Sequence, residues 1–176
     1  MASWPQVSRR LATVARALGA ESSFGATEET VAAGVAECFA APARGAAYLL
    51  LAVLTLEIPL PHEVTAALRA WRRSGSPEWI VSLARAAAGA DGVTPECEVR
   101  DGVVVDVTDT VASDYVTGIQ RVVREVAAHW SERAPITTVS WDAPRRRLHE
   151  VSLDNAWRAG RAIPFVIPFG GTFVLP

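Results

Sequence analysis

The sequence predicts a mixed α/β chain with an all-helical first half and a second half that begins a parallel sheet without completing it. Residues 1–88 carry apolar side chains at helical spacing only. Residues 103–107 form a near-continuous β-branched run, typical of a strand buried on both faces, and an amphipathic helix follows it. Between the halves, residues 89–102 are rich in glycine and acidic residues and have no helical period. We therefore expect a helical bundle or cap at 1–88, a linker at 89–102 and a partial α/β domain at 103–176.

Five helices are expected in the first half. Their limits follow from capping residues, first-turn prolines and glycine stops. The marker residues are Gly19, Thr27, Phe39, Pro42, Pro59, Pro61, Gly75, Ser76, Pro77 and Gly89. The third helix holds the most apolar stretch, residues 46–56. It is much shorter than the roughly 20 residues that cross a bilayer, so a core helix is expected. A peripheral membrane contact stays open as an alternative.

The linker can hold a short strand at residues 96–100.

In the second half, the helix that follows the strand at residues 103–107 has a capping box formed by Thr117 and Gln120. Its apolar side chains form one stripe, and Pro135 ends it before a second strand at residues 136–141. The stripe consists of Ile119, Val122, Val123, Val126 and Trp130. Beyond residue 142 the pattern weakens: residues 145–147 are three arginines typical of a solvated loop or helix face. A short helix through Trp157 and a third strand from Phe173 are expected after them.

Composition excludes several classes of function. The net charge is −2, which gives no electrostatic reason to expect a nucleic-acid partner. All 17 basic residues are arginine, so neither a Schiff-base lysine nor a P-loop lysine exists. Cys38 and Cys97 have no metal-ligand spacing, and we expect no metal site. The N-terminus lacks the apolar core of a secretory signal, so a cytoplasmic location is expected.

The loop at residues 108–118 follows the carboxyl end of the first strand, where open α/β sheets bind ligands. Asp106 and Asp109 supply acceptors for hydroxyl groups, as Asp114 does in the same loop. Gly118 allows close backbone approach at a helix N-terminus that can hold an anion. Each has a structural alternative. Asp106 can accept local backbone hydrogen bonds, and Gly118 can be required only by the turn.

Arg121 lies one turn into the same helix and could bind an anion through two parallel hydrogen bonds. An arginine on an exposed helix face is more often solvated, and that alternative also stays open. The loop carries no G-x-G-x-x-G dinucleotide fingerprint. His129 and His149 are isolated in the sequence, so no Ser/His/Asp or Cys/His arrangement is expected.

The segment DVTDTVASDYVTGIQRVVREVAAHW closely resembles the start of the catalytic region in bacterial glycosyltransferases of family 4, also called group 1. The resemblance lies in a strand ending in Asp-Val, a polar loop and a Thr-Gly-Ile-Gln-Arg-Val-Val-Arg run. It continues in a strand ending at Trp141 and in the proline- and glycine-containing run at 167–176, and so covers residues 103–176. The matching positions are Asp106, Val107, Thr117, Gly118, Ile119, Gln120, Arg121, Val122, Val123 and Arg124.

This resemblance implies a GT-B fold, in which two Rossmann-like domains enclose a cleft. The C-terminal domain holds a nucleotide-sugar, and the N-terminal domain presents a glycan or lipid-linked acceptor, without a metal or a cofactor beyond that co-substrate. The implied function is sugar transfer in bacterial polysaccharide biosynthesis, in the cytoplasm or at the inner face of the membrane. Residues expected to contact the acceptor or the donor phosphates are Asp106, Asp109, Thr117, Gly118, Gln120 and Arg121.

The family's donor-binding motif has no counterpart in residues 1–176. We therefore expect the chain alone to lack transferase activity and to need a C-terminal domain in cis or in trans. The alternative is a non-enzymatic helical interaction module that carries a degenerate sugar-binding half-domain.

Overall fold

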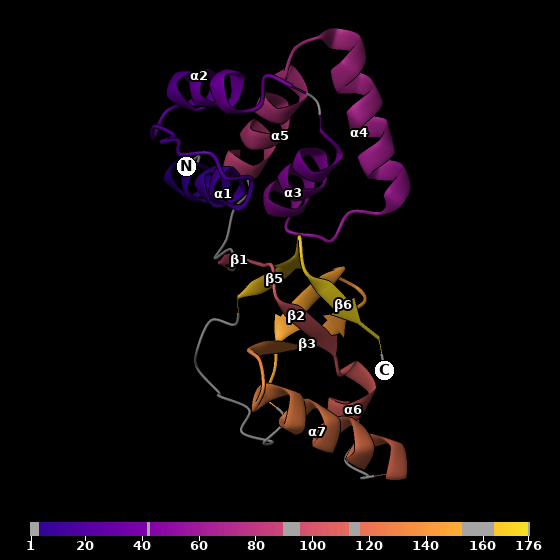
Figure 1. Cartoon of the computed structure of the whole chain (residues 1–176). Helices are drawn as coiled ribbons and strands as arrows, with labels where there is room; N and C mark the ends of the chain where they lie inside the picture. The colour runs from indigo at the N-terminus through magenta and orange to yellow at the C-terminus, as the bar shows by residue number, and fades with distance from the viewer. Residues whose placement is uncertain (1–3, 42, 90–95, 113–116, 153–163, 176) are drawn as a thin grey trace. The chain divides into compact units, whose positions relative to one another are not determined.

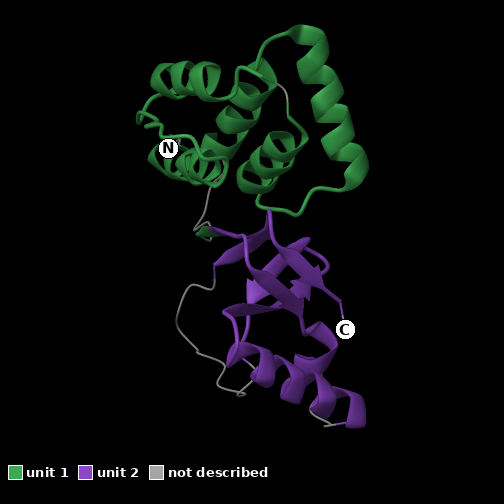
Figure 2. Cartoon of the chain, in the orientation of Figure 1, with its two compact units in different colours: residues 1–97 green, residues 98–176 purple. Residues whose placement is uncertain are grey.

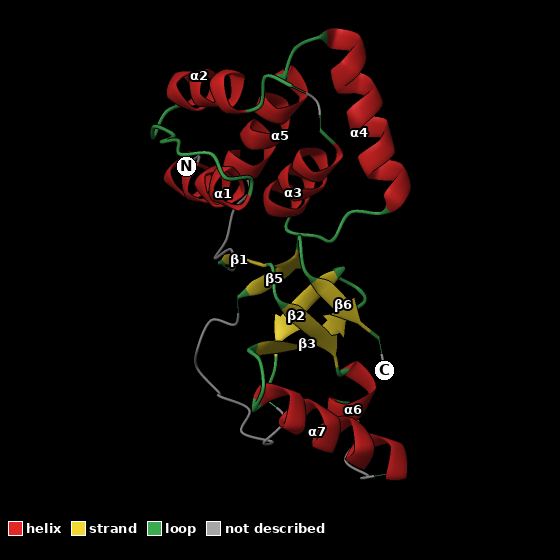
Figure 3. Cartoon of the chain, in the orientation of Figure 1, coloured by secondary structure: helices red, strands yellow, loops and turns green. Residues whose placement is uncertain are grey.

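The chain forms two compact units, residues 1–97 and residues 98–176 (Figure 2). The computed structural model describes residues 4–41, 43–89, 96–112, 117–152 and 164–175. In these residues every element before residue 97 is a helix, and the strands all come later (Figure 3). Most of the expected linker, residues 90–95, lies outside the described residues, and its remaining part contains the strand β1 (Cys97–Arg100).

Unit 1 is built around one central helix. The five helices are α1 (Trp4–Ala17), α2 (Glu28–Cys38), α3 (Arg44–Thr55), α4 (Pro61–Ser74) and α5 (Glu78–Gly89). Helix α3 packs against α1, α4 and α5, and its buried residues cover more than half of its circumference. This confirms that the apolar stretch is a core helix. None of the described helices is long and apolar enough to cross a membrane.

The helix limits in unit 1 follow the predicted capping chemistry. The Thr27 side chain accepts a hydrogen bond from the Thr30 amide, and the Thr30 side chain accepts one from the Thr27 amide. Pro61 begins α4, and Gly75 ends it with a left-handed φ of 61°. Helix α3 differs from the prediction, because Leu56 ends it in the left-handed conformation before Pro59 is reached.

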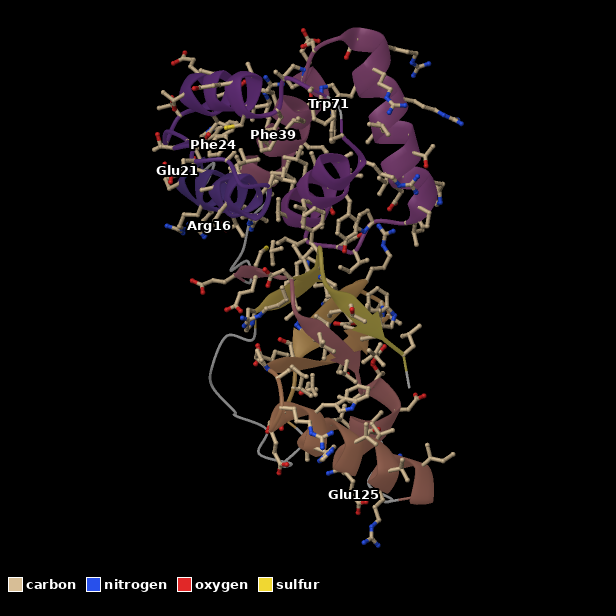
Figure 4. The ribbon with its side chains drawn as sticks, in the orientation of Figure 1. Arg16, Glu21, Phe24, Phe39, Trp71 and Glu125 are labelled. Atoms are coloured by element: carbon tan, nitrogen blue, oxygen red, sulfur yellow. The ribbon has the colours of Figure 1, made fainter. Side chains whose placement is uncertain are left out.

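Aromatic side chains fill the spaces between the helices of unit 1. The rings of Phe24 and Phe39 stack with centroids 6.2 Å apart, and Figure 4 shows them side by side. Trp71 is 1% exposed and meets Trp79 edge to face at 5.7 Å. Helix α5 buries Ile80, Ala84 and Ala88. The predicted buried stripe of that helix is therefore rotated, since Trp79, Leu83 and Ala87 are only half-buried.

Unit 2 contains a six-stranded mixed sheet in the order β1-β5-β4-β3-β2-β6. Helices α6 and α7 belong to the same unit (Figure 1). The remaining strands are β2 (Val103–Asp106), β3 (Ile136–Asp142), β4 (Arg147–Glu150), β5 (Phe165–Pro168) and β6 (Thr172–Val174), and the helices are α6 (Thr108–Val111) and α7 (Gly118–Ser131). Strand β2 runs parallel to β3 on one side and to β6 on the other. Val104 and Val105 are adjacent and both buried, so β2 is covered on both faces as its sequence predicts.

The second part of the sheet departs from the expected parallel arrangement. Strand β4 pairs antiparallel with β3, and β5 pairs antiparallel with β4. The arginine run lies in this hairpin: Arg146 takes a positive φ of 50° in the turn, and Arg147 begins β4. Neither β4 nor β5 was expected, because the arginines and the prolines of residues 162–169 obscure the alternation of a strand. The helix expected through Trp157 lies outside the described residues.

Helix α7 has the predicted limits but buries a different face. Thr117 caps it, and it ends before Pro135. Among its side chains only Ala127 is buried. Four members of the predicted core stripe are exposed instead: Ile119 by 79%, Val122 by 58%, Val126 by 39% and Trp130 by 38%. The helix contacts α6 and β3 through the neighbouring face, so its most apolar face is left outside the core.

Candidate functional site

The candidate site lies at the carboxyl end of β2. The chain reaches β3 on one side of β2 and β6 on the other, and all three strands are parallel. Where connections leave a strand in opposite directions, the carboxyl ends of an open sheet border a crevice that can accept ligands. Asp106 is the last residue of β2, and α6 begins two residues later.

A small hydrogen-bond network closes this end of the sheet. The Thr108 amide donates to Asp106 Oδ1 over 2.9 Å, and the Thr108 hydroxyl donates to the same oxygen. The Trp141 amide donates to Thr108 Oγ1 over 2.7 Å. Thr108 therefore joins the ends of β2 and β3. Asp106 takes the structural role that the sequence left open, since it accepts local hydrogen bonds.

The N-terminus of α7 is held beside α6 by Gln120. Its Oε1 accepts from the Thr117 amide over 2.9 Å, and its Nε2 donates to the Asp109 carbonyl over 3.0 Å. The Gln120 amide in turn donates to Thr117 Oγ1 over 3.3 Å. This is the predicted capping box, extended by a tertiary contact. The side chains of Thr117 and Gln120 thus position the helix, and both ends of the Gln120 side-chain amide are engaged.

Gly118 is the first residue of α7, and nothing local requires a glycine there. Its φ is not left-handed, and a Cβ on it would meet no atom of the described residues within 4 Å. The amides of Gly118 and Ile119 belong to the first helical turn and have no acceptor inside the helix. The alternative in which the turn alone demands glycine is therefore weakened. The open space and the two amides would suit close approach of an anion or a hydroxyl group.

Two further predicted side chains, Asp109 and Arg121, are exposed to solvent. Asp109 is exposed in the first turn of α6, where its charge interacts favourably with the helix dipole. Arg121 is 75% exposed and donates from Nε to Glu125 Oε1 over 2.9 Å, a pair at i, i+4. The structure therefore places Arg121 on the solvated face, as one sequence alternative has it. Asp114 lies outside the described residues.

A second charged group borders the carboxyl end of β3 and was missed from the sequence. Asp142 ends that strand and accepts from Arg145 Nη1 over 2.9 Å. The hydrogen bond from Arg145 holds the pKa of the Asp142 carboxyl below its usual range. His149 Nε2 lies 3.9 Å from Asp142 Oδ2. Burial lowers the pKa of the imidazole, which favours its neutral form, although Asp142 acts in the opposite direction. Only the β3–β4 pairing brings these residues together, so their spacing in the sequence gave no signal.

No group of three or more His, Cys, Asp or Glu side chains in the described parts of the chain is arranged to hold a metal ion. The candidate site is thus a set of backbone amides and carboxylates around α6 and the first turn of α7. Comparison with protein-family models, with curated proteins and with solved structures gives no match for this chain.

Proposed function

We propose that unit 2 acts in glycosyl transfer, as the part of a sugar transferase that lines the cleft and contacts the acceptor or the donor phosphates. The observation that carries this proposal is the open first turn of α7, which is held beside α6 after the carboxyl end of a strand with parallel neighbours on both sides. The resemblance of the Thr-Gly-Ile-Gln-Arg run to family 4 glycosyltransferases leads us to expect this arrangement. A Rossmann-like topology of unit 2 is part of the same proposal. The donor-binding domain would come in cis or in trans.

The residues have distinct roles in this proposal. The amides of Gly118 and Ile119 bind a phosphate oxygen or an acceptor hydroxyl, and Asp109 accepts from a sugar hydroxyl. Arg121 lies one turn further along, and in this proposal it leaves Glu125 to pair with an anion held at that turn. Asp106, Thr117 and Gln120 position these groups through the contacts described above. In the reaction the acceptor oxygen forms a bond to the anomeric carbon and its proton passes to the Asp109 carboxylate or to water, while the bond to the nucleotide diphosphate breaks. Fixed N–H groups stabilise the negative charge on the leaving diphosphate.

Gly118→Ala tests the proposal, because it separates binding from folding. The Cβ enters open space, so the helix should keep or gain stability, by about 0.4–1 kcal/mol. The same Cβ would stand in front of the first-turn amides and block an approaching ligand. We expect UDP-glucose or GDP-mannose at millimolar concentration to shift the amide NMR signals of Gly118 and Ile119 in the wild type. The variant should lose most of that response.

Gly89→Ala is the matched control. Gly89 ends α5 in unit 1, and its added Cβ also meets nothing within 4 Å. This variant should bind both probes as the wild type does. Probe-induced shifts absent from residues 117–121, or unchanged in Gly118→Ala, would contradict the proposal and favour the non-enzymatic interaction module.

A further inference from the structure

The outward face of α4 in unit 1 carries three arginines close together. Arg69, Arg72 and Arg73, called the arginine cluster below, are all exposed. At 100° per residue they lie within an arc of about 100° and within about 6 Å along the helix axis. Arg69 and Arg73 lie on the side opposite the buried Trp71, which faces the other helices. The cluster is therefore compact and open to solvent at the outside of unit 1 (Figure 1).

The positive charges of the arginine cluster are not balanced within the described part of the chain. None of the three guanidinium groups has an ion pair or a side-chain hydrogen bond to another described residue. Glu63, the acidic residue of α4, lies near the start of the helix, and its carboxylate accepts from the Leu60 amide over 2.7 Å. Arg69 precedes the other two arginines by three and four residues, a spacing at which like charges destabilise a helix.

The helix dipole accounts for only part of the arginine cluster. Cations in the last turn of a helix interact favourably with its free carbonyl groups, and Arg72 and Arg73 lie in that turn. Arg69 lies before it. Together with Ala66, the three arginines line an open hollow of about 490 Å³. Sites for small ligands commonly have volumes of about 300–1,000 Å³, so the hollow has room for one.

We propose that the arginine cluster binds a soluble ligand that carries two or more linked phosphate groups. Phosphate oxygens accept hydrogen bonds from guanidinium N–H groups in pairs, which match the planar fork of arginine. Two linked phosphates carry roughly as many negative charges near neutral pH as the cluster carries positive charges. Such a ligand also relieves the repulsion between the arginines. The proposal concerns unit 1 and does not depend on the proposed sugar transfer, whose test reads residues 117–121.

The size of the arginine cluster favours a soluble ligand over a membrane surface. Clusters that bind anionic lipids typically contain about four to eight basic residues. Here only three arginines occur on α4, all in its C-terminal half. Towards the N-terminus the same face continues with Ala66 and His62, which extend the cluster by no further arginine. Its charge is thus concentrated over a length that suits one small anion.

Inorganic pyrophosphate is the probe for this site. Millimolar sodium pyrophosphate should shift the amide NMR signals of residues 66–74 in the whole chain, together with the Nε signals of the three arginines. We expect a dissociation constant on the order of 1 mM, because water screens exposed charge pairs. Sodium chloride at the same ionic strength should leave these signals in place, which separates binding from screening.

Arg69→Gln tests the cluster with little risk to folding, because glutamine is also a good helix former. It should weaken pyrophosphate binding about three- to tenfold. It should not lower the thermal unfolding temperature of the ligand-free chain, since it removes like-charge repulsion. Arg9→Gln is the matched control: Arg9 is exposed on α1, and the variant loses the same charge. It should bind pyrophosphate as the wild type does.

Two further probes test other partners of an arginine cluster. Vesicles of equal parts phosphatidylserine and phosphatidylcholine present negative charge as a surface, and hexaglutamate presents it as a peptide. If the wild type binds either of them through Arg69 but does not respond to pyrophosphate, the proposal is overturned and the cluster belongs to that partner. Equal pyrophosphate binding by Arg69→Gln and the wild type, or no response in residues 66–74, would also overturn it.

Discussion

Thr108→Val should destabilise unit 2 although it changes little of the side chain's shape. The hydroxyl donates to Asp106 and accepts from the Trp141 amide, so one atom serves the ends of two strands. A hydrogen bond to a charged group contributes about 1.5–3 kcal/mol, and a half-buried amide left without an acceptor costs about 1–2 kcal/mol. Water can reach the half-buried Asp106, so the hydrogen bond to its carboxylate should contribute near the lower end of that range. We expect a total loss of about 2–4 kcal/mol.

Native-state hydrogen exchange resolves this effect, because it reports β2 and β3 separately from unit 1. A loss of that size should accelerate exchange in these strands by about 30- to 700-fold, at a factor of ten per 1.4 kcal/mol. Thr108→Ser retains the hydroxyl and should stay within about tenfold of the wild type. Thr55→Val removes one exposed hydrogen bond within α3 and should leave both strands unchanged. Wild-type exchange rates in β2 and β3 of Thr108→Val would show that the hydroxyl does not join the strands.

Two further outcomes follow from unit 2. Gly171→Ala should destabilise unit 2 by more than about 3 kcal/mol in chemical denaturation, because the new Cβ would overlap the Gly102 carbonyl oxygen. A loss below about 1 kcal/mol would show that the backbone at this close approach relaxes readily. His149 should make unit 2 less stable as the pH falls. Its pKa is lowered on folding, so the neutral form stabilises the fold above the unfolded value of about 6.5, and this contribution is lost as the pH falls through the folded pKa. The decrease between pH 7 and 5 should be smaller in His149→Gln, and equal pH profiles would contradict the role of burial.

Local chemistry made the helix limits predictable. Thr27 and Thr117 cap helices because a side-chain hydroxyl oxygen can accept from the first turn, and Gly75 ends α4 because glycine tolerates a left-handed φ. The β-branched run at residues 103–107 identified the interior strand β2, because adjacent β-branched side chains favour a strand that is buried on both faces. These features need only residues a few positions apart.

The strands β4 and β5 and the Asp142–His149 pair depend on tertiary structure. Arg147 and the prolines near β5 give no strand pattern, and the hairpin pairing with β3 decides their conformation. The distance between Asp142 and His149 likewise follows from the register of two strands, which the sequence alone does not specify. The place of Gln120 in the capping box was predictable from the sequence. Its contact with the Asp109 carbonyl was not, because that contact depends on how α7 packs beside α6.

The sequence by itself determined where α7 begins and ends, and that it has one apolar face. It did not determine which face the helix buries, because periodicity measures the contrast between the faces of a helix and not the position of its neighbours. The tertiary structure decided that Ala127 packs inward while Ile119 and Val122 stay exposed. It also decided that β2 has a parallel neighbour on each side and that the start of α7 is held beside α6, the helix that follows β2.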